Sequence, residues 1–173
     1  MARTLQIDIL GTEYHGKREK NVLYRLKRKP QAVTDYPYIV VSDKFEFLSS
    51  SYYSSSSTTD LFQVKDYRMI KANLKKSKVR EQIGLEVTIA DLRKQDSLQV
   101  GRWISHIKDI YKFCKCTNCQ FILSSGANSA VEMVSGRSFE SILRTCEIEP
   151  EHYWQELEKW IENKCKTRVF ADT

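Results

Sequence analysis

Three of the five cysteines lie within six residues, in the pattern Cys114-x-Cys116-x₂-Cys119. Thiols at this spacing suggest a metal or redox site, but a structural zinc ion needs four ligands, commonly from two Cys-x₂-Cys pairs. Only Cys116 and Cys119 form such a pair. The other possible ligands make no second spaced pair: Cys146, Cys165, His106 and His152. We therefore favour a helix, a turn and a strand over a zinc or thioredoxin-like site, and we expect Cys114 to face the core.

Sequence patterns for other enzyme chemistry are missing. A metal-dependent hydrolase needs clustered histidine and carboxylate ligands, but His15, His106 and His152 are far apart along the chain. The sequence also contains no Gly-x-Ser-x-Gly elbow, P-loop or dinucleotide fingerprint. We therefore expect no catalytic residue, and no metal or cofactor bound by the protein itself.

Positive charge is concentrated in the N-terminal half. The chain has 28 Lys+Arg against 22 Asp+Glu, with dense basic stretches at 17–29 and 65–80 and a glutamate-rich stretch at 140–162. This asymmetry predicts a polyanion as one partner and is compatible with a protein partner at the acidic end. Tyr14 and Tyr24 are interleaved with the first basic stretch, where they could stack on unpaired bases or simply pack. The cations expected to contact phosphate there are Lys17, Arg18, Arg25, Lys27 and Arg28.

A second basic face is predicted on a helix at Val100–Cys116. Lys108, Lys112 and Lys115 follow one another at i, i+4 and i+7, so they share one side of the helix. Clustered cations of this kind neutralise phosphates without reading bases. The alternative is an ordinary solvated helix face. Arg93 and Lys94 precede this helix and extend the basic surface.

Apolar periodicity predicts three helices. The first, Val100–Cys116, carries an apolar stripe of Val100, Trp103, Ile104, Ile107, Tyr111 and Cys114. A second begins at a Ser138 cap and continues to Cys146. A third opens at Pro150 and buries Trp154, Leu157, Trp160 and Ile161.

Six short segments have strand character: Leu5–Leu10, Val22–Leu26, Tyr38–Ser42, Leu61–Val64, Leu85–Ile89 and Phe121–Ser124. Ile39–Val41 and Phe121–Leu123 are continuously apolar, which is typical of parallel strands buried on both faces. Helices that follow such strands predict one α/β domain over residues 1–173. Within it, Leu48–Thr59 is Ser-rich and predicts a flexible loop, and 150–173 is a closing helix and tail.

The cellular compartment is inferred from three features of the sequence. The start, "MARTLQIDIL", lacks the apolar region of a signal peptide. No run approaches the roughly 18 apolar residues of a membrane span. An odd number of cysteines argues against a secreted disulfide framework. We expect a cytoplasmic protein.

An ordered series of motifs resembles a known family. "IGLEVTIADLRK" (Ile83–Lys94) is followed by Arg102 and the basic helix, then by "CQFILSSGANSAVEM" (Cys119–Met133) and "GRSFESILRTCEIEPEHYWQELE" (Gly136–Glu158). Together they are similar to the C-terminal half of the TIM-barrel-like protein subunit of archaeal and eukaryotic ribonuclease P, called RNase P protein component 3 in archaea. The resemblance covers about residues 80–165 and leaves residues 1–79 poorly matched.

This resemblance implies a non-catalytic subunit of a ribonucleoprotein in which RNA, using Mg²⁺, removes the 5′ leader of precursor tRNA. The implied partners are the RNase P RNA, precursor tRNA and a small ferredoxin-like subunit, in a heterotetramer. The implied fold is TIM-barrel-like. Because a full barrel takes about 250 residues, we expect a trimmed or distorted (β/α) barrel with short or missing helices in its N-terminal half. A metal-dependent hydrolase on a related barrel and a generic protein-binding scaffold are the alternatives.

The resemblance also draws attention to the ends of two strands. Glu86 is similar to a strand glutamate of the family, and a buried carboxylate needs a partner, which Arg93, Arg102 or Arg137 could supply. Ser124, Ser125 and Gly126 close a strand where barrel ligands usually sit, although a strand-to-loop turn held by the Ser125 hydroxyl is the favoured interpretation. Arg102 and Arg137 complete the predicted RNA-binding set.

Overall fold

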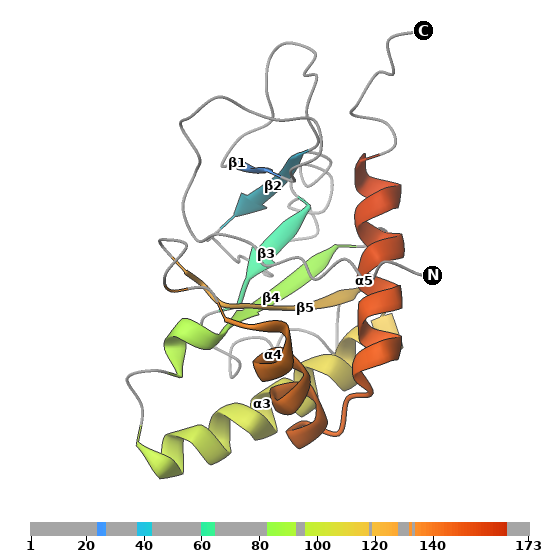
Figure 1. Ribbon diagram of the computed structural model, residues 1–173. Coiled ribbons are helices and arrows are strands. Elements are labelled where there is room, and N and C mark those ends of the chain that lie inside the picture. The colour runs from blue at the N-terminus through green and yellow to red at the C-terminus, as the bar shows by residue number, and fades with distance from the viewer. Residues whose placement is uncertain are drawn as a thin grey trace, which may run out of the picture.

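The computed structural model describes residues 24–26, 38–42, 60–64, 83–92, 96–117, 119–127, 132 and 134–165. In this part of the chain a parallel sheet and three helices form a mixed α/β fold (Figure 1). Outside the described residues lie the predicted strand at Leu5–Leu10, the predicted Ser-rich loop at Leu48–Thr59 and the tail after 165.

Five strands pair in the order in which they follow along the chain. They are β1 (Tyr24–Leu26), β2 (Tyr38–Ser42), β3 (Leu61–Gln63), β4 (Gly84–Thr88) and β5 (Gln120–Ser124). All four pairings are parallel, which confirms the pairing expected from the continuous apolar runs. In the best-formed pair, Leu85 lies opposite Phe121 and Val87 opposite Leu123.

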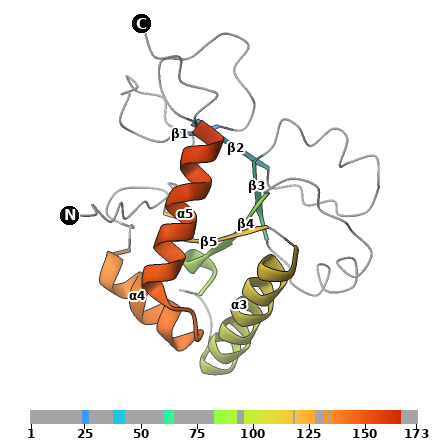
Figure 2. The same ribbon diagram turned by 90° about the vertical axis from the view of Figure 1, so that its right-hand side faces the viewer.

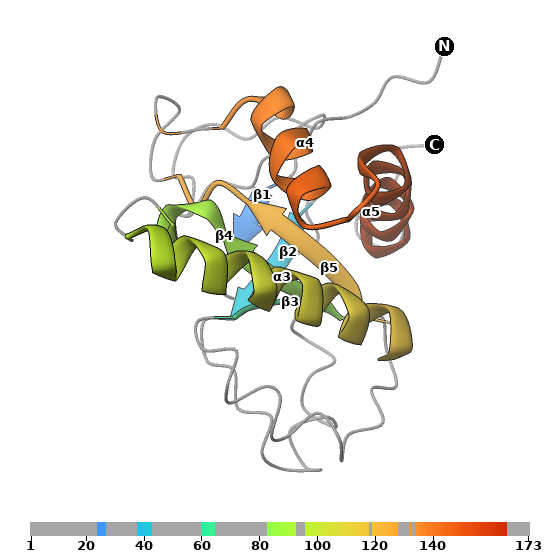
Figure 3. The ribbon, with the colours of Figure 1, turned by 90° about the horizontal axis from the view of Figure 1, so that it is seen from below.

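The chain passes from β4 to β5 through a short 3-10 helix, η2 (Ile89–Asp91), and the long helix α3 (Ser97–Thr117). After β5 come α4 (Gly136–Thr145) and α5 (Pro150–Cys165). Figure 2 shows α3 on one side of β5, with α4 and α5 on the other. Figure 3, from below, shows α3 running along the sheet beneath β5. The two strands that carry the predicted site therefore lie between helices.

The core follows the predicted apolar stripes. In α3 the buried side chains are Trp103, Ile107, Ile110 and Cys114, with Ile104 and Tyr111 partly buried. In α5 they are Pro150, Tyr153, Trp154, Leu157, Trp160 and Ile161. The prediction that Cys114 faces the core is confirmed, since it is 3% exposed.

The start of α4 differs from the prediction. Its N-cap is Ser135, whose hydroxyl oxygen accepts a hydrogen bond from the Ser138 N–H at 3.3 Å. Ser138 was expected to be the cap itself. Both serines are good capping residues, but Ser138 occupies the third helical position, where its N–H is one of the donors that a cap must satisfy.

At Leu123, the outer edge of β5 is covered by a side chain and not by another strand. The Leu123 N–H donates to the hydroxyl of Tyr153 at 2.9 Å, and the Leu123 carbonyl lies 3.5 Å from the same oxygen. Two residues before Leu123, the Phe121 carbonyl accepts a hydrogen bond from the side-chain amide of Gln120 at 2.8 Å. Because exposed strand edges invite unwanted pairing, these contacts protect β5.

None of the helices in the described part of the chain is long and apolar enough to cross a membrane.

Candidate functional site

Glu86 is a buried carboxylate on β4, the strand next to β5. It is the middle residue of β4, it is 0% exposed, and its Oε1 accepts a hydrogen bond from the Ser124 hydroxyl at 2.6 Å. Ser124 is the last residue of β5 and is itself buried. Of the three arginines considered as partners, Arg102 and Arg137 are exposed, and Arg93 lies outside the described residues. The observed contact therefore joins the middle of β4 to the carboxyl end of β5.

Ser125 and Gly126 form a closely packed turn after β5. The Ser125 hydroxyl accepts a hydrogen bond from the Ala127 N–H at 3.0 Å, and its carbonyl accepts one from Ala90 N–H at 3.0 Å. Gly126 has φ +64°, and a Cβ at this position would lie 2.9 Å from the Cβ of Thr88. Glycine is thus required both by the backbone conformation and by close approach to β4. These contacts give Ser125 and Gly126 a structural role at the strand end.

The predicted lysine face of α3 is partly occupied by ion pairs. Lys108 Nζ lies 2.6 Å from Glu147 Oε1, and Lys115 Nζ pairs with Glu156 Oε1. Lys115 also lies 3.2 Å from the ring nitrogen Nε2 of His152. Two lysines seven residues apart thus link α3 to the end of α4 and to α5. Each of these two lysines is therefore already paired with a carboxylate.

Lys112 lies between these two lysines and is exposed. Within the described residues it makes no ion pair, although its charge and that of Lys108 both act on Glu147. The hydrogen bond and the charge of Lys108 hold the pKa of the Glu147 carboxyl below its usual value, with Lys112 adding a smaller effect. Lys112 is therefore the member of the predicted lysine face with the most accessible charge.

The other predicted RNA-binding residues lie on separate elements or outside the described residues. Arg102 lies in the second turn of α3 and Arg137 in the first turn of α4, and both are exposed. Arg25 is in β1. The remaining predicted cations lie outside the described residues: Lys17, Arg18, Lys27, Arg28, Arg93 and Lys94.

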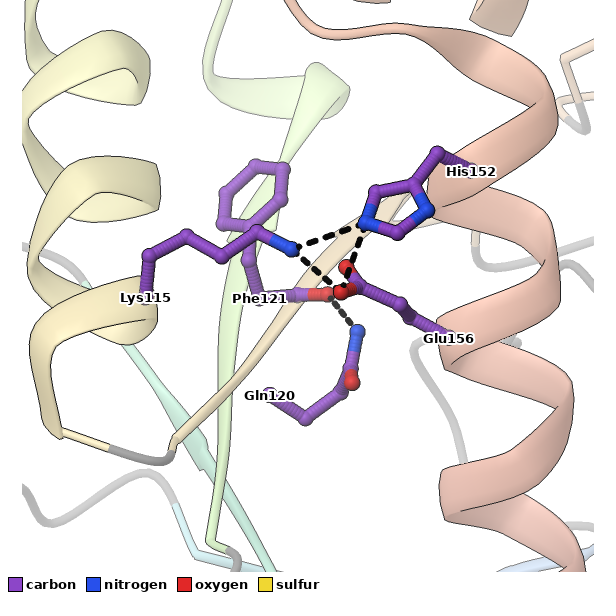
Figure 4. A network of polar contacts seen from close by, with 5 residues as sticks. All are labelled: Lys115, Gln120, Phe121, His152 and Glu156. Carbon is purple, nitrogen blue, oxygen red and sulfur yellow. Dashed lines mark hydrogen bonds and ion pairs between the residues drawn. The ribbon is translucent and has the colours of Figure 1, made fainter.

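A polar network missed by the sequence analysis joins the C-terminal part of α3 to α5 (Figure 4). Lys115 reaches across the start of β5 toward α5, where His152 and Glu156 lie one turn apart, with His152 Nε2 3.0 Å from Glu156 Oε1. Partial burial opposes the charged form of Lys115, but the hydrogen bond to Glu156 and the electrostatic effects of Tyr111 and Glu156 outweigh it. The pKa of the Lys115 ammonium is therefore raised. The only signal for this network in the sequence was the i, i+4 spacing of His152 and Glu156.

Beside this network lies a cavity of about 370 Å³ between α3 and α5, at the amino end of β5. Cys114 and Cys119 contribute to its lining. Burial raises the pKa of both thiols, that of Cys114 well above its usual value. These groups are therefore neutral near pH 7 and poor nucleophiles. In the described part of the chain, no group of three or more histidine, cysteine or acidic side chains is placed to hold a metal ion.

Comparison of the chain with models of protein families, with curated proteins and with solved structures finds no match in any of the three.

Proposed function

We propose that this chain is a non-catalytic protein subunit of ribonuclease P, of the TIM-barrel-like family that it resembles. The observation that carries the proposal is the ordered series of motifs from Ile83 to Glu158. In the described fold these motifs coincide with β4, α3, β5, α4 and α5 in that order. The chain would support the RNA that removes the 5′ leader of precursor tRNA and would perform no cleavage alone.

The order of strands supports a barrel-derived fold. In doubly wound sheets the strand order reverses at a switch point, whereas in a (β/α) barrel each strand pairs with the next along the chain. The five described strands follow the second pattern. We infer a trimmed or distorted barrel, which is the fold that the resemblance implies. In this proposal Tyr153 and α5 cover the edge of β5 at Leu123, in place of a further strand.

RNA contact would rest on phosphate neutralisation. In the described part of the chain, Arg102, Lys112 and Arg137 are exposed and make no ion pair. We assign the larger share of binding to them and to the N-terminal cations. Lys108 and Lys115 would contribute less, because each is already paired with a glutamate.

The proposal extends to partners and compartment. The chain would act in the cytoplasm with the RNase P RNA, precursor tRNA and a small ferredoxin-like subunit, in a heterotetramer. Mg²⁺ would be used by the RNA and not held by this protein.

The salt dependence of RNA binding tests this assignment. We expect the affinity for RNase P RNA to fall steeply as ionic strength rises, because bound cations release counterions from the phosphates. Lys112→Ala should reduce the slope of log K against log[salt] by about 1, and Lys108→Ala should reduce it less. Gln155→Ala, an exposed neutral position on α5, is the control. If the chain has no affinity for RNA, and if its affinity for the small subunit does not change with salt concentration, the chain is instead a protein-binding scaffold.

A further inference from the structure

The cavity between α3 and α5 has the size of a small-molecule site. Its volume of about 370 Å³ falls within the range of roughly 300–1,000 Å³ that is common for ligand pockets. Tyr111 and Lys115 line it from α3, Gln120 and Phe121 from β5, and Lys159 and Asn163 from α5. It lies at the amino end of β5, whereas the contact of Ser124 with Glu86 and the turn at Ser125 and Gly126 lie at the carboxyl end of this strand.

The charges around the cavity favour an anion. The carboxylate of Glu156 is held by Lys115 and lies 3.0 Å from His152 Nε2. Lys159, one turn further along α5, is exposed and makes no ion pair within the described residues. The neighbouring thiols of Cys114 and Cys119 stay protonated near neutral pH, because burial raises their pKa. One cation is therefore left without a counter-charge at the cavity.

The rest of the cavity lining is uncharged and consists of polar and apolar side chains. Asn163 offers an amide donor and an amide acceptor, and Gln120 offers its amide oxygen and the second of its two N–H groups, since the first donates to the Phe121 carbonyl. Phe121 and Trp160 contribute apolar surface beside them. A phosphate ion alone would leave this apolar surface and most of the volume unfilled. A ligand that matches the whole lining has an anionic group attached to a flat apolar body with polar edges.

We propose that this cavity binds a nucleoside monophosphate, with the phosphate at Lys159 and the base between the apolar lining and the side-chain amides of Gln120 and Asn163. The nucleotide could be free or could be an unpaired nucleotide of an RNA chain. Binding of a free nucleotide is independent of the ribonuclease P proposal, whereas the RNA source rests on it.

Titration of the full chain with AMP, adenosine and inorganic phosphate at constant ionic strength tests the site, with heat or tryptophan fluorescence as the readout. We expect saturable AMP binding that is about tenfold tighter than binding of adenosine or phosphate, because a charge-assisted contact adds to base burial. Lys159→Ala should weaken AMP binding about tenfold and leave adenosine binding within a factor of about two. Arg144→Ala removes a positive charge at an exposed position of α4 outside the cavity and should change neither.

Two results would overturn the proposal: no saturable AMP binding at millimolar concentrations, or equal weakening by Lys159→Ala and Arg144→Ala. If AMP binds, competition with a short single-stranded RNA shows which nucleotide the cavity takes. Displacement of AMP by the RNA indicates an unpaired nucleotide of an RNA chain. If the RNA does not displace AMP, the ligand is a free nucleotide. Stimulation of precursor-tRNA cleavage without AMP binding would reject this site and keep the subunit proposal. AMP binding without stimulation would keep the site and reject the subunit proposal.

Discussion

The ammonium of Lys108 lies 2.6 Å from the carboxylate of Glu147, a residue that ends α4 with φ +59°. This is the left-handed conformation, which is uncommon for a residue other than glycine. The Ile148 N–H returns to the Leu143 carbonyl at 2.9 Å, as in a Schellman motif. Glu147 thus combines an unfavourable backbone conformation with an ion pair that links α4 to α3.

The two contributions can be separated by substitution. Glu147→Ala removes the ion pair and keeps a Cβ in the left-handed region, whereas Glu147→Gly removes both. We therefore expect Glu147→Gly to be more stable than Glu147→Ala by about 1 kcal/mol in urea unfolding. Equal stability of the two variants would show that the helix end adopts another conformation.

Acid should weaken the Lys108–Glu147 pair. The pKa of the Glu147 carboxyl is lowered by Lys108 from a value of 4.5, so the folded state binds this proton less readily than the unfolded chain. Its stabilising contribution is present above pH 4.5 and is lost as the pH falls through the lower, folded pKa. The difference in unfolding free energy between the natural chain and Glu147→Gln should be constant near neutral pH and should vanish in acid. High salt should reduce it at every pH, because Glu147 is exposed.

Tyr153→Phe should destabilise the edge of the sheet. The substitution removes the hydroxyl that accepts the Leu123 N–H at 2.9 Å, and it leaves a buried donor without that partner. We expect a loss of about 1–3 kcal/mol of unfolding free energy. Tyr111→Phe, at a partly buried tyrosine on α3, is the comparison and should lose less. A Tyr153→Phe variant as stable as the natural chain would mean that this edge is covered in some other way.

Two glycines should respond to alanine in opposite directions. At Gly126, φ +64° and a Cβ only 2.9 Å from the Thr88 Cβ make alanine unfavourable, and we expect a loss of at least about 1–2 kcal/mol. At Gly101, within α3, a Cβ would meet nothing within 4 Å. Gly101→Ala should therefore raise the free energy of unfolding by about 0.5–1 kcal/mol through helix propensity. Thermal or urea unfolding of the pair measures both effects, and loss of stability in both variants would contradict the assignment of Gly101 to an exposed helix face.

The elements that the sequence predicted well have strong local signals. Tyr38–Ser42 was predicted with its observed bounds, and α5 begins at the predicted Pro150, because apolar runs, periodicity and helix-start residues act over short distances. The cap of α4 was placed at the wrong serine, since Ser135 and Ser138 are equally suited by residue type.

The ion pairs could not be predicted in the same way. Lys108 and Glu147 are 39 residues apart in sequence, and Lys115 and Glu156 are 41 apart. Both pairs depend on how α3, α4 and α5 pack around β5, which local patterns do not determine. The sequence therefore identified the lysine face of α3 but not that two of its three lysines face glutamates.

The most direct test of the subunit proposal is cleavage of precursor tRNA by RNase P RNA at limiting Mg²⁺. The reaction is run with and without this protein and its small ferredoxin-like partner. We predict stimulation only when both proteins are present, with Lys112→Ala reducing it and Gln155→Ala leaving it unchanged. No stimulation, together with metal-dependent cleavage by the purified protein alone, would contradict the account and indicate a hydrolase.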